Sequence, residues 1–584
     1  MEPHQFYDER LSDLQALLKK MQRRKSSFAW LRLGAIAAII LAFYLLWSLG
    51  IGYVIIAGIL LVFIFVRLVY ADLNNQAKIE HTHHLININE DEVKCLAGDY
   101  YDLPDGAHHI PKDHHYANDL DIFGRASLFQ YINRTTSEMG SSRLADYLKQ
   151  PAAIHLIPER QTALKELSTK SLWLQDLQAM GRKTPITFST RTRLNEWMKE
   201  APSFSAFTHW KWLRYLLPVI IISITTLYIA DRVGDGLFYL TLLVFALIAY
   251  QINKVVAPVH DKLSRIAGEL NILSVSIAHI ENENFDSPLL KKLQSAFIEK
   301  NKKASNDIYD IQKILDKLDL RYNFVLSAPL NILLLWNLQQ MLDLEKWKAT
   351  QKNSTDIWFD TLASFESLNS LAILHFNHPE WIFHTIKEDY FSIEGTGIGH
   401  PLIPENKRVD NYIAIADNGK LMLVTGSNMA GKSTYLRSIG VNVVLAMAGS
   451  PVCATAFSVS HVNVISSMRI TDNLEESTST FYAELKKLKT IIEKVNNEER
   501  VFILLDEILR GTNSLDRHTG SSALIKQLIK KKTAAIIATH DLELANLKEE
   551  FYDNILNYHF DVQVSNEELY FDYRLKPGVC NSLN

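Results

Sequence analysis

The segment from Leu33 to Val66 contains no Asp, Glu, Lys or Arg, and Arg32 and Arg67 close it on either side. As one helix it would be about 50 Å long at ~1.5 Å per residue, whereas the hydrocarbon core of a bilayer is about 30 Å thick. The segment is therefore too long for one span and suits two. Ser48 to Gly52 is the cluster of helix-breaking residues near its middle. We predict a transmembrane hairpin with spans near residues 30–48 and 51–69.

A second pair of apolar segments follows the same pattern later in the chain. Tyr215 to Ala230 and Gly236 to Ile252 are separated by a polar loop, Asp231 to Asp235. Lysines and arginines cluster before the first span, before the third and after the fourth, while the two hairpin loops contain only Arg232. Because positive charge stays on the cytoplasmic side, we predict a multi-pass protein of the cytoplasmic membrane with both termini in the cytoplasm. The alternative for each pair is a helical hairpin buried in a protein core.

The charge balance and the cysteines limit the classes of function further. The 61 Lys and Arg residues are nearly matched by 65 Asp and Glu residues, which gives a formal net charge of −4. This balance gives no electrostatic sign of a nucleic-acid-binding protein, although it is compatible with a local basic groove. Cys95, Cys453 and Cys580 lie far apart and in no metal-ligand spacing, which suits a reducing compartment.

Residues 255–350 have the periodicity of long helices. Apolar residues recur in alternating steps of three and four in two segments, which predicts a coiled-coil-like seam on each. Asp286 to Pro288 breaks the chain between them, so we expect an antiparallel helical pair that acts as a lever or spacer. The predicted seam residues are Leu263, Ile266, Leu270, Leu273, Ile277 and Ile280, then Ile308, Ile311, Leu315, Leu318, Tyr322 and Val325.

The stretch between the hairpins is rich in histidine and raises the question of a metal site. Its histidines come mostly as adjacent pairs among Pro, Gly and Asp, without the i,i+4 spacing of a helical metal site. Adjacent side chains seldom converge on one ion. A solvated loop is therefore the favoured interpretation, a metal site is the alternative, and we expect no metal cluster. The histidines are His81, His83, His84, His108, His109, His114 and His115.

The chemistry-bearing motifs lie near the C-terminus, and the first is a phosphate-binding loop. Residues 426–433 match the pattern G-x-x-x-x-G-K-[ST], with a predicted strand, Lys420 to Thr425, before the loop and a helix after it. The glycines let backbone amides point at phosphate, and the helix adds its positive dipole end. Lys432 is predicted to reach the β- and γ-phosphates of ATP, and Ser433 to bind Mg²⁺. The predicted nucleotide-binding residues are Gly426, Ser427, Asn428, Met429, Ala430, Gly431, Lys432, Ser433 and Thr434.

Two further apolar segments end in residues that can act on the same phosphates. Val501 to Leu505 is typical of a buried parallel strand, and two carboxylates follow it. We predict that Asp506 holds Mg²⁺ and that Glu507 takes a proton from the attacking water. Another predicted strand, Thr533 to Ala538, leads to His540, which is placed to sense the γ-phosphate.

A segment rich in hydroxyl groups lies between these elements. Ser477 to Thr480 suits a helix start, and apolar residues follow it at helical spacing from Phe481. A helix start with hydroxyl groups is an anion site, but the glycine-rich loop already supplies one for the same phosphates. We therefore predict that this helix end meets the nucleotide of a partner subunit.

Taken in order, four segments resemble the ATPase domain of the MutS mismatch-repair family. The resemblance implies an ABC-type ATPase that closes as a homodimer around two nucleotides, with Ser479 acting on the γ-phosphate bound by the partner. The family's mismatch-reading domain and its DNA clamp are not evident here, because membrane hairpins stand at those places. The segments are TGSNMAGKST, STSTFYAEL, LLDEILRGTNSLDR and IATHDLEL, with weaker support from GHPLIPE at 399–405 and from residues 119–151.

These observations predict a multidomain fold with a C-terminal α/β P-loop ATPase of the ABC type, an all-α lever and core, and two transmembrane hairpins. The predicted function is a membrane-anchored, Mg²⁺-dependent MutS-like ATPase that couples ATP turnover at a dimer interface to DNA binding. A membrane-bound nucleotide switch acting on a protein or lipid partner without DNA is the alternative, and an ABC transporter subunit is a remote one. The predicted divisions are 1–72 (basic helix and first hairpin), 73–118 (histidine-rich connection), 119–208 (helical core), 209–254 (second hairpin), 255–380 (lever) and 381–584 (ATPase domain).

Overall fold

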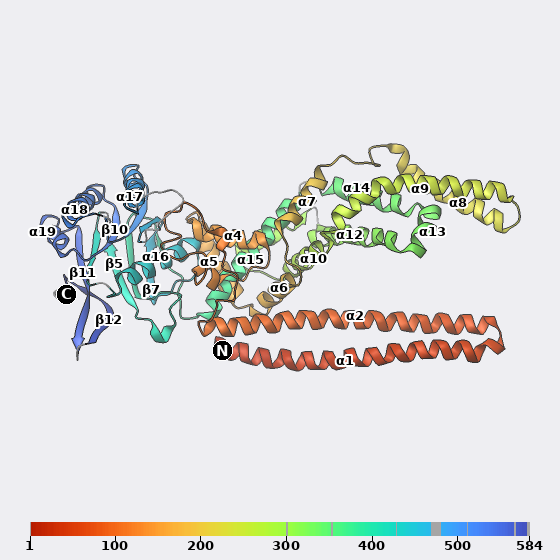
Figure 1. Ribbon diagram of the computed structural model, residues 1–584, viewed down its shortest axis with the longest axis horizontal. Coiled ribbons are helices and arrows are strands. Elements are labelled where there is room, and N and C mark those ends of the chain that lie inside the picture. The colour runs from red at the N-terminus through yellow and green to blue at the C-terminus, as the bar shows by residue number, and fades with distance from the viewer. Residues whose placement is uncertain are drawn as a thin grey trace.

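The computed structural model describes residues 2–299, 302–351, 354–417, 419–427, 429–468, 480–510, 512–565 and 568–580. The molecule is elongated (Figure 1). An α/β domain formed by the C-terminal part of the chain lies at one end of the long axis, and the loops of two helical hairpins lie at the other end. Helices of the middle part of the chain connect these two ends.

The first hairpin is longer than the sequence predicted. It consists of α1 (Pro3–Leu46) and α2 (Ile51–Leu96), joined by the short helix η1 (Trp47–Leu49) and by Gly50. The two helices have 44 and 46 residues, roughly twice the length that crosses a bilayer. Their outer halves are apolar and exposed, whereas their inner halves pack on the body of the protein through Leu14 and Ile88. The predicted connection from residue 73 is therefore wrong, because α2 continues as a helix to Leu96.

A buried polar network fixes the base of this hairpin. The Tyr7 hydroxyl of α1 donates to Asn377 Oδ1 (2.7 Å), and Asn377 Nδ2 donates to Glu92 Oε2 of α2 (2.8 Å). Glu92 also forms a buried ion pair with Arg134, whose Nη2 lies 3.0 Å from Glu92 Oε2. Removing either partner would leave a buried charge unpaired, which is strongly destabilising. Both helices of the hairpin are thus joined to the helical core.

The middle of the chain is almost entirely helical. The second hairpin consists of α8 (Thr208–Ile229) and α9 (Asp235–Ser264). Helix α9 continues beyond its apolar part and enters the lever. The other elements are η2 (Ala107–His109), α3 (Leu128–Ile132), α4 (Glu138–Lys149), α5 (Leu156–Ser168), α6 (Ser171–Lys183), α7 (Phe188–Lys199), α10 (Ala267–Glu281), α11 (Pro288–Ser295), β1 (Ile298–Glu299), β2 (Lys302–Lys303), α12 (Ala304–Leu318), η3 (Asp319–Tyr322), α13 (Phe324–Leu334), α14 (Trp336–Thr350) and α15 (Thr355–Asn377).

The predicted seams are confirmed in the lever except at one end. Helices α10 and α12 pack against each other, and the predicted residues from Leu263 to Ile280 and from Ile308 to Leu318 are buried. Tyr322 and Val325, however, are 63% and 75% exposed. The prediction was wrong for these two residues because the chain turns at η3 after Leu318 and leaves the lever.

The C-terminal domain contains a six-stranded sheet and a four-stranded sheet. The larger sheet has the order β12-β11-β6-β10-β9-β8; the strands from β11 to β8 are parallel, and β12 is an antiparallel edge. Its strands are β6 (Leu421–Thr425), β8 (Asn463–Ser467), β9 (Val501–Asp506), β10 (Ala534–Thr539), β11 (Ile555–Ser565) and β12 (Glu568–Pro577). The smaller sheet, β3-β7-β4-β5, uses β3 (Thr385–Lys387), β4 (Ser392–Ile398), β5 (Asn411–Ala416) and β7 (Ala456–Ser460).

Both faces of the larger sheet are covered. Successive residues of β9 alternate between two apolar clusters: Phe502 and Leu504 belong to one, Ile503 and Leu505 to the other. Such double burial explains why the central strands are continuous apolar runs. The helices of this domain are α16 (Lys432–Ala448), α17 (Thr480–Asn496), α18 (Ser514–Lys530) and α19 (Leu547–Glu550), with short turns η4 (Glu405–Lys407) and η5 (Leu542–Asn546).

The histidine-rich stretch is not the single solvated loop that the sequence favoured. His81, His83 and His84 lie on α2, where the helical periodicity of the packed inner half overrides the loop interpretation. His81 Nε2 is 2.9 Å from Asp176 Oδ1, and His109 Nε2 is 2.8 Å from Ser141 Oγ. His114 Nε2 is 3.0 Å from the carbonyl oxygen of Lys149, and His114 Nδ1 accepts hydrogen bonds from the backbone N–H groups of Tyr116 and Ala117. Within the described ranges, these histidines do not form a group of three ligands around one point.

Four helices among the described residues are long and apolar enough to cross a membrane by length and composition: α1, α2, α8 and α9. In the most apolar part of α2, no residue is buried inside the protein. The loops of both hairpins lie at the same end of the molecule (Figure 1).

Candidate functional site

The parallel sheet brings the predicted site residues together at one edge. In the ladder, Thr539 of β10 is opposite Thr425 of β6, and Ala538 is opposite Asp506 of β9. The carboxyl ends of these three strands therefore meet, which is where ligands bind in open α/β sheets. Residues separated by more than a hundred positions become neighbours here.

The glycine-rich loop follows β6 and leads into α16. Gly426 has φ of 149°, and a Cβ there would lie 2.9 Å from the backbone oxygen of Phe560. Gly431 has φ of 103° and precedes the first helical residue, Lys432. Glycine is thus required at both positions, because a side chain would clash at the first and be strained at both. The predicted Asn428 lies outside the described residues.

Lys432 lies across this loop. Its Nζ donates to the carbonyls of Gly426 (2.6 Å) and Ser427 (2.8 Å), and burial lowers the pKa of the side chain. The ammonium group therefore occupies the centre of the loop, where phosphate oxygens could replace the two carbonyls as its partners.

Ser433 and Asp506 form the centre of the site. The Ser433 hydroxyl donates to Asp506 Oδ2 at 2.5 Å. Burial raises the pKa of the Asp506 carboxyl, and its Oδ1 accepts no hydrogen bond from the residues that the structure describes. A hydroxyl beside a buried carboxylate with an unsatisfied oxygen is a set of hard oxygen donors, which fits Mg²⁺.

Glu507 lies next to these two residues and is held by two basic side chains. Its Oε2 is 3.0 Å from Arg510 Nε, and its Oε1 is 3.4 Å from His540 Nδ1. Arg510 Nη2 also lies 3.6 Å from Asp506 Oδ2, so one guanidinium faces both acids. This pairing was not predicted from the sequence, although an arginine three and four residues after two acids was a readable signal.

Glu484 connects α17 to the same segment. Its buried carboxylate accepts a hydrogen bond from the backbone N–H of Leu509 at 2.5 Å, and burial raises its pKa. Glu507 and Leu509 both have positive φ, 55° and 59°, so the turn after β9 is held in a conformation that needs support. Sequence reasoning missed this role, because Glu484 is distant in the chain from the turn it holds.

The predicted trans-acting residue lies outside the described residues. Ser479 belongs to the segment 469–479, which precedes the described start of α17 at Thr480. Its predicted contact with a partner's nucleotide stays a prediction.

Comparison with known proteins agrees with this arrangement. A sequence model of MutS domain V matches residues 422–583, which contain the loop, both acids, Arg510 and His540. The C-terminal part of the chain, residues 422–583, is a MutS domain V. The chain is similar to MutS protein homolog 4 of Homo sapiens (31% identical over 196 residues; 32% of this chain, 20% of the relative) and to DNA mismatch repair protein MutS of Persephonella marina (34% over 197 residues; 33% and 22%). With DNA mismatch repair protein MutS of Finegoldia magna it is 31% identical over 230 residues (38% and 26%).

The matches with these relatives cover about a third to two fifths of this chain. The matched segments make up about a fifth to a quarter of the length of these relatives. The two hairpins lie outside the residues that the domain V model covers.

A cavity of about 380 Å³ opens beside the glycine-rich loop of domain V. Beyond the loop and Glu507, it is lined by His400, Arg408, Asn411, Phe560 and Tyr573. Burial, and then the charge of Arg437, lower the pKa of His400 to about 4, so its imidazole is neutral at pH 7. Besides the cationic Lys407 and Arg408, the cavity offers the aromatic rings of Phe560 and Tyr573 next to the phosphate loop, where a nucleotide base could lie. Sequence reasoning chose no residue for this part, because these residues come from three separate segments without a shared motif.

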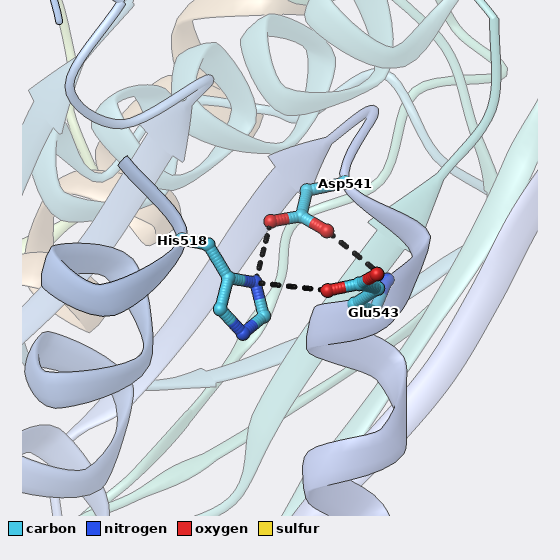
Figure 2. A group of neighbouring side chains, drawn as sticks. All are labelled: His518, Asp541 and Glu543. Atoms are coloured by element: carbon cyan, nitrogen blue, oxygen red, sulfur yellow. Dashed lines mark hydrogen bonds and ion pairs between the residues drawn. The ribbon is translucent and has the colours of Figure 1, made fainter. Parts of the chain in front are cut away.

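Figure 2 shows a further group of titratable side chains in domain V: His518, Asp541 and Glu543. His518 Nδ1 is 2.8 Å from Asp541 Oδ2 and 4.0 Å from Glu543 Oε2, so one nitrogen faces both carboxylates. Asp541 Oδ1 also accepts a hydrogen bond from the Glu543 N–H at 3.0 Å, which caps η5. These contacts cap η5 directly after His540 and hold it against His518 of α18. We assign no metal to this group.

Proposed function

We propose that this protein is a membrane-anchored, Mg²⁺-dependent ATPase of the MutS type. The observation that carries the proposal is the 2.5 Å hydrogen bond between Ser433 and Asp506, whose neighbours in the chain are Lys432 and Glu507. Lys432 supplies a phosphate-binding cation and Glu507 a proton acceptor. Ser433 and Asp506 supply two oxygen ligands for a metal, and all four residues lie at the carboxyl edge of the parallel sheet.

Each residue has a definite task in this proposal. The loop amides and Lys432 bind the phosphates, because the ammonium group exchanges its two carbonyl partners for phosphate oxygens. Ser433 and Asp506 hold Mg²⁺, which neutralises charge that develops on the phosphates. Glu507 accepts the proton of the attacking water, and His540 keeps its carboxylate in place. Arg510 pairs with both acids, so its guanidinium would compete with a metal ion for Asp506.

We propose further that the domain works as a homodimer, in which Ser479 reaches the nucleotide of the other subunit. Glu484 lies on α17, whose described part starts at Thr480, and it hydrogen-bonds the turn that carries Arg510. A movement of the start of α17 towards a partner's γ-phosphate would therefore be transmitted to the catalytic turn of its own subunit.

Membrane anchoring through both hairpins, with the termini and domain V in the cytoplasm, is part of the proposal. It is supported by four exposed apolar helices and by the position of both hairpin loops at the same end of the molecule, far from domain V. Arg32 and Asp72 pair at 3.0 Å across α1 and α2, where the apolar halves give way to the packed inner halves.

Two of the relatives reported above are named DNA mismatch repair proteins, and we propose DNA, bound along the helical lever, as the partner of the ATPase. One observation favours the alternative of a switch that acts on a protein or lipid partner without DNA. The base of the first hairpin is locked to the core by Tyr7, Asn377 and Glu92, so movements in the core would be passed directly to the membrane helices.

The test is an ATPase assay on the detergent-purified full chain with Mg²⁺, without DNA and with duplex, mismatched or branched DNA. We expect Mg²⁺-dependent turnover that is absent in Lys432→Ala and is stimulated by DNA. DNA affinity should fall steeply with rising salt, because phosphate contacts release counterions. Turnover that persists in Lys432→Ala would refute the ATPase assignment. Intact turnover without DNA binding or stimulation would replace the DNA-coupled function by the switch.

A further inference from the structure

Helix α13 (Phe324–Leu334) is an apolar helix that the protein itself does not bury. The sequence from Tyr322 to Leu342 contains no Asp, Glu, Lys or Arg. None of the described side chains of α13, from Val325 to Leu334, is buried; Val325 is 75% exposed and Leu326 is 46% exposed. A helix that is apolar all round is normally found in a core or in a membrane, because exposing it to water is unfavourable.

The position of α13 restricts what can cover it. It packs against α8 and α9, the helices of the second hairpin (Figure 1). After Leu334 the chain bends by 74° into α14, with Leu335 at φ of 48°. With eleven residues, α13 is about 16 Å long, so it is too short to cross a bilayer.

Polar contacts at its two ends show how deep α13 lies along α9. Before α13, the Tyr322 hydroxyl donates to Asp261 Oδ1 at 3.0 Å. After it, Asn337 Nδ2 donates to Asn253 Oδ1 at 3.2 Å. Asn253 and Asp261 are eight positions apart on α9, which is about 12 Å along the axis. Helix α13 therefore lies beside the base of the second hairpin and has its C-terminal end nearer the hairpin loop.

The side chains around this level are those of a membrane interface. Lys254 lies over the ring of Tyr250 (4.8 Å to the centroid), and Arg214 lies over the ring of Tyr215 (5.2 Å). Exposed aromatic rings paired with cations are typical of the lipid headgroup region, where the cations meet phosphate and the rings lie at the acyl boundary. Arg214 Nε also donates a hydrogen bond to Gln339 Oε1 of α14 at 2.8 Å.

We propose that α13 is a third membrane contact: a helix that inserts part-way into the cytoplasmic leaflet beside α8 and α9 without crossing it, so that phospholipid covers its exposed apolar side chains. This inference rests on the proposed membrane anchoring of the second hairpin. Its consequence is that the far end of the lever is held in the bilayer by α13, which connects α12 to α14. A movement of α12 and α14 changes the depth of α13.

The test uses single cysteines labelled with an environment-sensitive fluorophore in the full chain, reconstituted in phospholipid vesicles. Val325→Cys and Ala328→Cys report on α13, Val244→Cys on the middle of α9, and Lys291→Cys on the exposed surface of α11. The wild-type chain, in which Cys95, Cys453 and Cys580 are buried, measures background labelling. Each labelled variant must keep the ATPase rate of the wild-type chain. Quenching is measured with aqueous iodide and with lipids that carry a nitroxide near the headgroup or at the middle of the acyl chain.

We expect the α13 probes to lose most of their emission to the shallow nitroxide and little to iodide. The Val244 probe should respond most to the deep nitroxide, and the Lys291 probe to iodide alone. If the Val244 probe is quenched by lipid but the α13 probes are open to iodide, the inference is wrong while membrane anchoring stands. If the α13 probes are shielded from both quenchers, a second copy of the chain covers the helix, and the inference is also wrong. If the Val244 probe is not quenched by lipid, the proposed anchoring fails first.

Discussion

The site in domain V and the stretch from His81 to His115 are both rich in side chains that bind protons or ions, but only the first gathers them. Ser433 comes from the start of α16, and Asp506 and Glu507 come from the end of β9. Ser433 hydrogen-bonds Asp506, and Arg510 pairs with both acids. The histidines are spread over α2, a short 3₁₀ turn and a loop, and those with assigned contacts each have a separate partner.

The difference lies in how the backbone arranges the residues. The carboxyl ends of parallel strands all lie at one edge of the sheet. The residues that directly follow these strands therefore lie close together. A helix distributes neighbouring residues around its axis, so His81, His83 and His84 point in different directions. A high density of reactive residue types is therefore a weaker sign of a site than their position at the ends of parallel strands.

The largest effect is expected from Lys432→Ala. The variant should lose measurable nucleotide binding and turnover, because no other described side chain crosses the loop to reach the phosphates. Calorimetric titration with ATP and Mg²⁺ measures the change, with Lys486→Ala, an exposed lysine on α17, as the matched control. Normal ATP affinity in Lys432→Ala would mean that the site is not where the strand ends place it.

Glu507→Gln should separate binding from chemistry. Removing a positioned general base typically lowers the rate by about 10² to 10⁴. The turnover rate should fall by that factor while the affinity for ATP is kept. Single-turnover kinetics measure the rate, and equilibrium binding measures the affinity. Unchanged turnover would show that water is activated by another group.

Glu484→Gln is expected to have a smaller, indirect effect. The carboxylate touches no nucleotide but holds the turn after β9, and a hydrogen bond to a charged group contributes about 1.5–3 kcal/mol, of which part is retained by the amide. We expect kcat to fall about tenfold with little change in KM. A change in KM with kcat intact would contradict a positioning role, and recovery in Glu484→Asp would support it.

His81→Asn should have the smallest effect. The contact of His81 with Asp176 is about one-third exposed, and such pairs contribute about 0–1 kcal/mol. Chemical denaturation should show a loss of free energy of unfolding within this range, with unchanged ATPase turnover. Metal analysis of the wild-type chain is the sharper measurement: stoichiometric zinc that disappears in the variant would overturn the contrast between the two regions.

Much of the domain V site could be predicted because its information is local. The loop from Gly426 to Ser433, the strand before it and the acids after β9 are each readable within about ten residues. The roles of Arg510 and Glu484 were missed, because their contacts depend on the exact turn after β9. Helix α13 was misread as lever because its apolar spacing continues the pattern of α12, and spacing alone does not show where a helix turns away.

The amino-acid sequence by itself determined the uncharged runs of both hairpins, the phosphate loop and the acidic strand end, since charge, glycine and strand periodicity act over short distances. Only the tertiary structure decided that the first hairpin extends to Leu96 and is locked by Glu92 to Arg134 and Asn377. It also decided that Glu484 holds the catalytic turn and that α13 lies uncovered beside α9. These features depend on contacts between segments far apart in the chain, which appear only when the helices and sheets have packed against one another.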